Sequence, residues 1–229
     1  MKTLRKLNIL IVTAFLSLFS FQSVAQEGFY LGAKFAPGIS AIKSNTYNDS
    51  VKVETTIALG GGGLMGYQFN QHIATQLEVM YMASGQKYKA GTVDYHVRTN
   101  YLSMPLLLKL STDINNPVSF NIQFGPQISF LMGTELETDN AGGGVQIEPE
   151  ISIRPQDIGI AYGLGMDFNI TSDSKLQGLF GFRGINGLVD INNKDERNPE
   201  NPGVTENYII IERATTSLYG IYLGLQYRF

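Results

Sequence analysis

Apolar and polar residues alternate with a period of two through most of the chain after residue 27, which is typical of strands with two different faces. In Ile158–Ile170 the even positions carry Ile, Tyr, Leu, Met or Phe and the odd positions carry Gly, Ala, Asp or Asn. Each such segment is long enough to cross a bilayer as a tilted strand, which takes about 9–11 residues. The eight predicted strands are Gly28–Ile42, Thr56–Asn70, Ile73–Ser84, Val97–Leu110, Phe120–Phe130, Ile158–Ile170, Leu176–Leu188 and Tyr219–Phe229.

The predicted connections alternate between short and long. The short ones are Asn70-Gln71-His72, Ser111–Pro117 and Thr171–Lys175, and the long ones are Lys43–Thr55, Gly85–His96, Gly133–Gln156 and Val189–Ile211. In outer-membrane barrels the short turns face the periplasm and the long loops face outside. The pattern therefore predicts an all-β fold, an eight-stranded antiparallel up-and-down transmembrane β-barrel with both termini periplasmic. Pro105 and Pro126 each remove a ladder donor, so we expect a bulge or local break at each.

Residue size indicates which face of the strands points into the barrel. The less apolar face is dominated by glycines, namely Gly32, Gly60, Gly62, Gly66, Gly163, Gly165, Gly181 and Gly224. The same face carries six charged residues, Lys34, Glu78, Lys109, Asp167, Arg183 and Arg228. An eight-stranded barrel is just wide enough to be filled by side chains, so small residues among a few long charged ones suit its lumen. The bulky apolar face then meets lipid.

The six predicted lumen charges are four basic and two acidic groups. A lone buried charge costs several kcal/mol, so we expect Glu78 and Asp167 each to lie against basic neighbours. Such a set could form a selectivity filter or a proton path, but the narrow bore favours a structural plug of ion pairs. Outward aromatics near strand ends are expected to form a girdle at the membrane boundary, although aromatics also favour strands in general: Phe29, Tyr67, Phe69, Tyr81, Phe168, Tyr219, Tyr227 and Phe229.

The first residues have the features of a secretory signal peptide. Lys2, Arg5 and Lys6 precede a largely apolar run, Ile9–Phe21, and Ser23-Val24-Ala25 supplies small residues for cleavage after Ala25. An uncleaved anchor would need roughly 20 apolar residues. We therefore predict a signal peptide over residues 1–25 and an outer-membrane β-barrel over residues 26–229.

Composition excludes several other classes of protein. Removing the three basic residues of the signal peptide leaves 14 Lys and Arg against 20 Asp and Glu, and a net charge of −6 argues against nucleic acid as a partner. The chain has no cysteine, which rules out disulfides and thiolate metal sites. We expect no cofactor, outer-membrane lipid as the surrounding partner, and a monomer.

Two segments resemble known outer-membrane sequences. The end of the chain carries apolar residues at alternate positions, Ile221, Leu223, Leu225, Tyr227 and Phe229, and resembles the C-terminal signal that the barrel-assembly machinery reads. Tyr101-Leu-Ser-Met-Pro-Leu-Leu-Leu-Lys109 and Phe29-Tyr-Leu-Gly-Ala-Lys-Phe-Ala-Pro-Gly38 resemble the PorT-like, "porin family" outer-membrane β-barrel domain. This resemblance implies an OmpA-like eight-stranded barrel over the whole mature chain. It brings no catalytic residues, because the family has no established catalytic motif, and its name does not imply a conducting pore.

The sequence contains only weak candidates for catalytic or metal-binding residues. His96 near Asp94 could orient a base, but no serine nearby has the context of a nucleophile. Acidic residues gather in the third long loop (Glu135, Glu137, Asp139, Glu148, Glu150 and Asp157) and could take Ca²⁺, although a solvated acidic loop is the simpler interpretation. Gly60–Gly63 lacks the Lys-Ser/Thr and helix of a phosphate-binding loop. We predict no catalytic and no metal site.

These observations leave four hypotheses. The first is a non-enzymatic outer-membrane barrel with a structural, surface-binding or transport-accessory role, whose long extracellular loops bind a ligand. The second is a narrow solute or ion pore. The third is an outer-membrane enzyme acting on lipid or peptide, with His96 as base, and the fourth is a soluble lipocalin-like barrel with large apolar residues inside.

Overall fold

The computed structural model describes residues 28–46, 52–54, 56–90, 93–139, 154–190 and 211–229. These residues form the strands β1 (Gly28–Thr46), β2 (Lys52–Glu54), β3 (Thr56–Gln68), β4 (Ile73–Ala90), β5 (Val93–Ser111), β6 (Val118–Asp139), β7 (Gln156–Asn169), β8 (Leu176–Gly187) and β9 (Ile211–Arg228). The part of the chain described here contains no helix long and apolar enough to cross a membrane. The predicted signal peptide, residues 1–25, lies outside the described residues.

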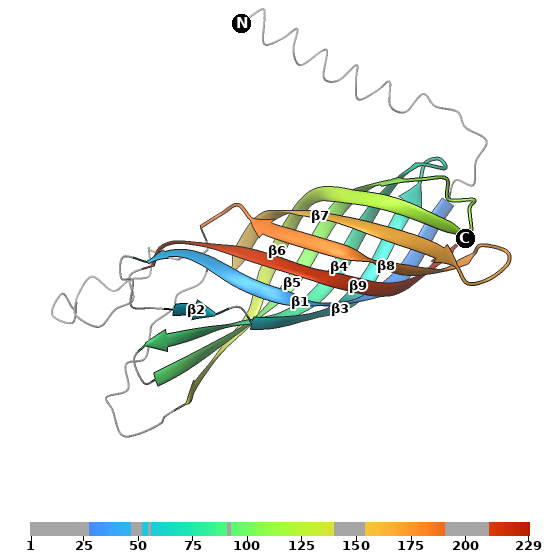
Figure 1. Cartoon of the computed structure of the whole chain (residues 1–229). Coiled ribbons are helices and arrows are strands. Elements are labelled where there is room, and N and C mark those ends of the chain that lie inside the picture. Colours follow the sequence, from blue (N-terminus) through green and yellow to red (C-terminus); the bar gives the residue numbers. More distant parts are fainter. Residues whose placement is uncertain (1–27, 47–51, 55, 91–92, 140–153, 191–210) are drawn as a thin grey trace, which may run out of the picture.

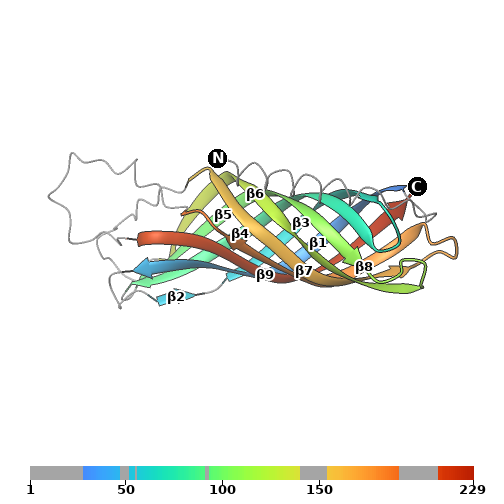
Figure 2. The same cartoon turned by 90° about the horizontal axis from the view of Figure 1, so that it is seen from above.

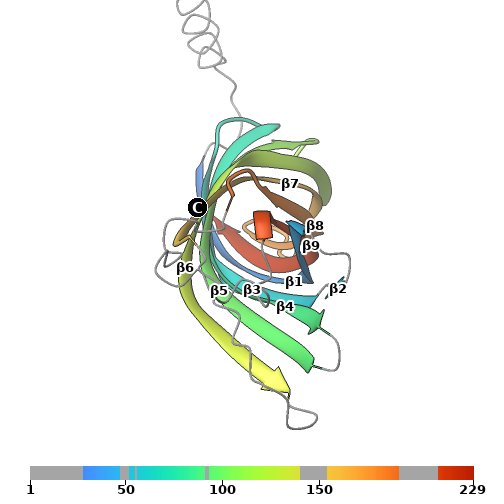
Figure 3. The same ribbon diagram turned by 90° about the vertical axis from the view of Figure 1, so that its left-hand side faces the viewer.

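The eight long strands form a closed antiparallel barrel. Each pairs with the next along the chain, and closure comes from β1, which pairs with β3 on one side and with β9 on the other. Figures 1 and 2 show the strands wrapping obliquely around a common axis, and Figure 3 looks along that axis. The short strand β2 lies outside the ring and pairs with Lys87–Lys89 of β4. The predicted fold class, an eight-stranded antiparallel barrel, is confirmed.

Most of the large apolar side chains of the strands point outward. Phe124, Leu164 and Leu223 are 45%, 61% and 49% exposed, and the positions between such residues are buried. A sheet that alternates in this way places its two residue sets on opposite faces. A soluble lipocalin-like barrel requires large apolar residues inside, so the side-chain orientation of the described strands contradicts that hypothesis.

Inward glycines make room for long side chains that cross the lumen. A Cβ on Gly66 would meet the Tyr30 ring, and a Cβ on Gly165 or Gly181 would meet the Tyr222 ring or hydroxyl. The tyrosine rings therefore occupy space that the glycines leave free. This arrangement explains why small residues are enriched on the inner face of so narrow a barrel.

Aromatic side chains gather on the outside at the short-turn end of the barrel. Tyr67 makes edge-to-face contacts with Phe29 at 4.9 Å and with Phe69 at 5.2 Å between ring centroids, and Tyr227 contacts Phe229 at 5.3 Å. Phe29, Tyr67 and Tyr227 belong to β1, β3 and β9, and Phe69 and Phe229 lie just beyond the ends of β3 and β9. An amphipathic aromatic band of this kind suits the boundary between hydrocarbon and water.

The strands are longer than the sequence predicted at the opposite, long-loop end. The segment Gly85–His96, predicted as a loop, is mostly a hairpin, because β4 and β5 remain paired as far as Ala90 and Val93. β1 continues to Thr46 and β6 to Asp139. The expectation of four long loops was therefore wrong for Gly85–His96 and too broad for the loops after β1 and β6. These extensions are richer in charged and polar residues than the rest of the strands, which is why the sequence pattern indicated loops there.

The two prolines do not end their strands. β5 runs through Pro105 and β6 through Pro126 without a shift of register. Between β5 and β6, the ladder is interrupted at Leu106 and Leu107, which lie opposite Pro126 and Gly125. This is the local break expected beside a proline, because its nitrogen cannot donate a hydrogen bond. The register of β5 and β6 shifts instead between Asn100 and Tyr101, where the polar extension begins.

The short turns are closed by local hydrogen bonds. In the turn between β7 and β8, Ser174 has a φ of 58° and its amide donates to the Thr171 carbonyl at 3.0 Å. The Thr171 hydroxyl donates to the Asp173 carboxylate at 2.6 Å, and this hydrogen bond lowers the pKa of Asp173 below its usual value. Between β3 and β4, the Asn70 side chain accepts from the His72 and Ile73 amides. His72 thus has an ordinary turn position.

Candidate functional site

A buried ion cluster lies inside the barrel around Glu78 of β4. Lys34 of β1 donates to Glu78 Oε1 at 2.7 Å, and Arg183 of β8 donates with both Nη atoms at 3.0 and 3.1 Å. Gln76 Nε2 donates to the same carboxylate at 2.6 Å. One carboxylate therefore joins side chains from three strands, and the three charged groups together carry a net charge of +1.

A second ion pair lies toward the short-turn end and is linked to the first. Lys109 Nζ donates to Asp167, whose other oxygen accepts from Asn121 at 3.0 Å. Gln123 donates to Asn121 Oδ1 at 2.7 Å and accepts from Arg183 Nη2 at 2.7 Å. A continuous chain of hydrogen bonds thus runs from Glu78 to Lys109 across the lumen.

Two inward tyrosines fill the space between these ions. The Tyr222 ring lies 4.3 Å from Lys34 Nζ and 5.5 Å from the Arg183 guanidinium carbon, within reach of a cation–π attraction. Tyr30 donates to Gln76 Oε1 at 3.2 Å. Both tyrosines are 2% exposed or less, so ions, amides and rings together form a packed cross-section, which we call the plug.

The six predicted lumen charges are not equivalent. Five of them are 3–6% exposed and belong to the plug, namely Lys34, Glu78, Lys109, Asp167 and Arg183. Arg228 is only half-buried, near the short-turn mouth, and its Nη2 has no hydrogen-bond partner in the part of the chain that the structure describes. Below the plug, Gln226 donates to Gln177 at 2.7 Å and Gln177 donates to Asn169 at 2.8 Å. Side chains therefore continue to fill the lumen toward that mouth.

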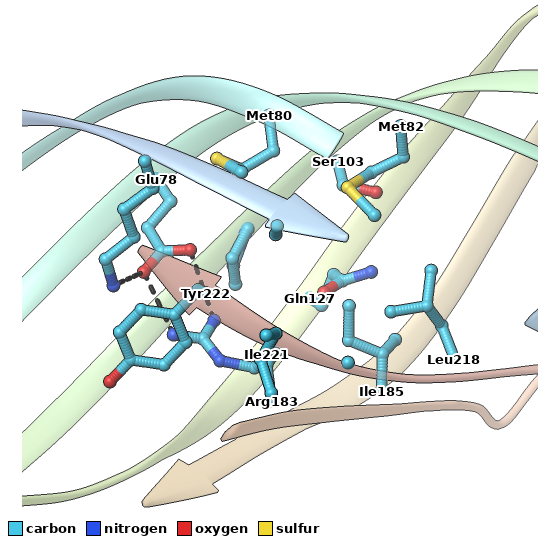
Figure 4. Close-up of a pocket in the computed structure, with 14 residues that line it drawn as sticks. Glu78, Met80, Met82, Ser103, Gln127, Arg183, Ile185, Leu218, Ile221 and Tyr222 are labelled. Atoms are coloured by element: carbon cyan, nitrogen blue, oxygen red, sulfur yellow. Dashed lines mark hydrogen bonds and ion pairs between the residues drawn. The ribbon is translucent and has the colours of Figure 1, made fainter. Parts of the chain in front are cut away.

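A small hollow lies on the long-loop side of the plug, and we call it the vestibule (Figure 4). Its floor is made by Lys34, Glu78, Arg183 and Tyr222, and its walls by Ala36, Met80, Met82, Ser103, Pro105, Gln127, Ile185 and Leu218. About 30 Å³ is free for the centres of water molecules, room for roughly two waters. The vestibule is thus a half-enclosed cup, apolar around the sides and cationic at the base.

The inner face also has apolar and aromatic members that were not predicted from the sequence. Tyr30, Met80, Met82 and Tyr101 are all buried inside the barrel. In each strand they lie an even number of residues from a charged inward residue (Lys34, Glu78 or Lys109), so they are on the same face as that residue. Counting alternate positions from the charged residues would therefore have identified them. They were overlooked because a large apolar residue was assigned to the lipid side by its type alone.

Other residues singled out as candidates lie in strands. Asp157 was predicted to belong to an acidic loop, but it is an inward residue of β7 whose carboxylate accepts from the Thr216 hydroxyl. Glu135, Glu137 and Asp139 belong to β6, and Asp94 and His96 to β5. The segment with Glu148 and Glu150 lies outside the described residues. Among the described residues, no group of three or more His, Cys, Asp or Glu could hold a metal ion.

The residues of the predicted assembly signal line the last strand. Ile221, Leu223, Leu225, Tyr227 and Phe229 are 42–70% exposed on the outer face of β9 and beyond its end. The Phe229 amide donates to the Phe29 carbonyl at 3.0 Å, and β9 pairs with β1 along most of its length. The signal segment therefore forms one side of the closing seam of the barrel.

Comparison with protein families gives a match over most of the chain. The family described as "Outer membrane protein beta-barrel domain" matches residues 22–195. None of the curated proteins compared with the chain matches it.

Solved structures of bacterial outer-membrane proteins are similar to the chain over most of its length. OprG from Pseudomonas aeruginosa is 14% identical, with 90% of this chain and 96% of that chain covered and a TM-score of 0.49. Neisserial surface protein A is 15% identical (88% and 97% covered, TM-score 0.44). Ail of Yersinia pestis, in complex with the heparin analogue sucrose octasulfate, is 14% identical (88% and 99% covered, TM-score 0.41).

Proposed function

Because the chain belongs to the outer membrane protein beta-barrel family and lies in the bacterial outer membrane, we propose that it is a non-conducting scaffold for binding outside the cell. In this role the barrel holds the molecule in the membrane and is not itself a channel. The strand ends and loops opposite the short turns make contact with a ligand. The observation that carries the proposal is the plug, which fills the lumen with paired ions.

The plug argues against a pore because its groups are paired and buried. Passage of an ion would require separating Glu78 from Lys34 and Arg183, and breaking a buried pair costs about 3–5 kcal/mol. Below this level Gln226, Gln177 and Asn169 of the adjacent strands β9, β8 and β7 are hydrogen-bonded to one another along the inner wall. A narrow pore, the alternative function, needs a continuous water path that this cross-section does not offer.

The long-loop end offers the larger surface for a partner. Here β2 and the ends of β4, β5 and β6 project beyond the ends of β3, β7 and β8 as a small sheet, which we call the sheet extension (Figure 1). β4 runs six residues past Ser84, about 20 Å of extended chain. The β6–β7 ladder ends at Phe130 and Gln156, whereas β6 stays paired with β5 up to Asp139. Rigid strands that carry loops are a common platform for recognition.

The remaining features of this proposal come from the sequence. Cleavage after Ala25 would release a mature barrel whose last strand, together with Phe229 after it, is read by the barrel-assembly machinery. The PorT-like motif Tyr101–Lys109 supports membership of that subgroup and carries no activity with it. Both ends of the barrel chain lie beside the short turns, so a periplasmic position for these turns would place both termini in the periplasm.

The orientation is tested by single cysteines, since the natural chain has none. Lys89→Cys lies in the sheet extension and Asn115→Cys in the exposed turn between β5 and β6. On intact cells, a membrane-impermeant maleimide should label Lys89→Cys, and Asn115→Cys should react only after the outer membrane is opened. The reverse labelling pattern would refute the external role of the sheet extension.

The binding role is tested by shortening the β4–β5 hairpin. Replacing residues 86–97 with Asn-Gly leaves the barrel strands intact and should preserve the heat-modifiable band on a gel. In nanodiscs, the natural protein should bind saturably to at least one of immobilised matrix proteins, glycosaminoglycans or lipopolysaccharide, and the shortened variant about tenfold more weakly. Equal binding by both proteins, or no binding by the natural protein, contradicts the proposal.

Planar-bilayer recording tests the pore alternative. The natural protein should be silent, whereas a variant with Lys34, Glu78 and Arg183 all replaced by alanine should show steps of conductance, because the plug then loses its centre. Stepwise conductance by the natural, folded protein would favour the narrow pore over the scaffold.

A further inference from the structure

Two of the residues that line the vestibule each have a buried polar atom without a hydrogen-bond partner among the described residues. Arg183 Nε and Gln127 Oε1 are buried and have no hydrogen-bond partner among the described residues. Arg183 is 6% and Gln127 5% exposed, and both residues line the vestibule. A buried polar atom without a partner costs about 1–3 kcal/mol, so a guest that satisfies such atoms is favoured.

The unpaired groups favour a guest that accepts hydrogen bonds. Arg183 Nε carries a hydrogen to donate. Lys34 Nζ makes one hydrogen bond to the described residues, although an ammonium has three donors. The Gln127 amide donates to the Ser129 hydroxyl at 3.0 Å. If its two ends exchange, it accepts from that hydroxyl and presents a donor to the vestibule. The vestibule can thus offer donors from three side chains, Arg183 and Lys34 of the floor and Gln127 of the wall.

Charge points to an anion. The floor holds two cations against the single carboxylate of Glu78, a net charge of +1 in a site with little water. An excess positive charge in such surroundings favours an acidic guest more strongly than it would in bulk water. The Asp167–Lys109 pair is internally balanced and does not offset this excess.

The walls limit the size and character of the rest of the guest. Met80 and Met82 of β4 face Ile185 of β8 and Leu218 of β9 across the vestibule, and methionine adapts readily to the shape of a bound molecule. Space for roughly two waters corresponds to a molecule of only a few heavy atoms. A long acyl chain is therefore too large for the vestibule as it stands.

We propose that the vestibule binds a short-chain monocarboxylate, with the carboxylate on the floor near Arg183 and Lys34 and the alkyl group against Met80 and Met82. Acetate and propionate have the right size, charge and amphipathic character. The inference concerns the lumen and holds whether or not the sheet extension binds a partner outside the cell.

Methionine methyl groups provide a direct test. The protein is labelled with ¹³C-methyl methionine, inserted in nanodiscs and titrated with propionate. The methyl signals of Met80 and Met82, assigned by Met→Leu variants, should shift and saturate with a dissociation constant of about 1–10 mM, since so small a guest gains only a few kcal/mol. Met65 and Met132 are 51% and 61% exposed on the lipid side and report unspecific partitioning.

Two variants and a matched control variant test which side chains bind the carboxylate. Arg183→Lys keeps the charge but removes Nε, and it should weaken propionate about tenfold; Gln127→Leu should weaken it about fivefold. The matched control is Gln226→Leu, which removes a buried, unpaired amide oxygen outside the vestibule and should leave binding unchanged. Gel shifts on heating establish that each variant is folded.

Three results would overturn the proposal. The first is no saturable shift of Met80 and Met82, which would mean that the vestibule holds only water. The second is equal binding of propionamide, which would show that the anionic group is not recognised. The third is a parallel, linear shift of Met65 and Met132, which would reveal partitioning into lipid.

Discussion

Replacing Glu78 by glutamine should destabilise the barrel more than any other single substitution in the lumen. The substitution keeps the size of the side chain and removes only its charge. Lys34 and Arg183 would then face each other without the carboxylate that now lies between them at 2.7 to 3.1 Å.

The expected magnitude follows from the charges. Two unit charges 4 Å apart attract by about 4 kcal/mol at an effective dielectric constant of 20, so the loss of two attractions amounts to about 8 kcal/mol. Glutamine regains several kcal/mol, because a buried carboxylate is costly to desolvate. The net loss should be about 3–5 kcal/mol, the range measured when one partner of a buried ion pair is removed.

Urea unfolding of the protein in lipid vesicles, followed by tyrosine fluorescence and by heat-modifiability on gels, measures this loss. A triple variant, Lys34→Met, Glu78→Leu and Arg183→Met, is the matched control. It removes all three charges and should recover most of the stability, since apolar replacement of a whole buried ion cluster is often neutral. A loss below about 1 kcal/mol for Glu78→Gln would refute the claim that Glu78 joins the two cations.

Three further predictions concern packing, the lipid face and assembly. Gly165→Ala should lower the free energy of unfolding by about 1–3 kcal/mol, because the added Cβ meets the Tyr222 hydroxyl, whereas Gly133→Ala, with open space at its Cβ, should have no effect in the same urea titration. Leu164→Arg should cost about 2–4 kcal/mol if its outward position lies near the bilayer midplane, and an unchanged unfolding midpoint would contradict the lipid-facing assignment. Phe229→Ala should slow the appearance of heat-modifiable protein in cells and leave refolding from urea into vesicles unchanged; equal slowing in both assays would indicate a folding defect rather than lost recognition.

The strand count, the order of the strands and the side that meets lipid could all be predicted from the sequence. Ile158–Ile170 shows why: a strand with lipid on one face and a narrow lumen on the other is constrained at every position, and a slip of one residue would exchange the faces. The prediction failed where that constraint ends. Beyond Ser84 and Asn100 the strands carry more charged and polar residues, among them Lys87, Lys89, Asp94 and His96, so this part of β4 and β5 looked like a loop although the strands remain paired.

The candidate site was predictable only in part. The parity of Lys34, Glu78 and Arg183 placed them on the inner face, and the cost of burying single charges required that the acidic groups have basic neighbours. The choice of partners depended on the stagger of the closed barrel, which brings Glu78 of β4 to Arg183 of β8, 105 residues later in the chain. The alternation of apolar and polar residues along each strand does not determine this stagger.

The sequence by itself thus determined which residues point outward or inward, because membrane and lumen impose opposite polarities on alternate positions. Only the tertiary structure decided which inward residues meet and where a space remains between them. The plug and the vestibule arise from closure of β1 on β9, which sets side chains from distant strands at one level, and glycines such as Gly165 then determine how far each side chain reaches across.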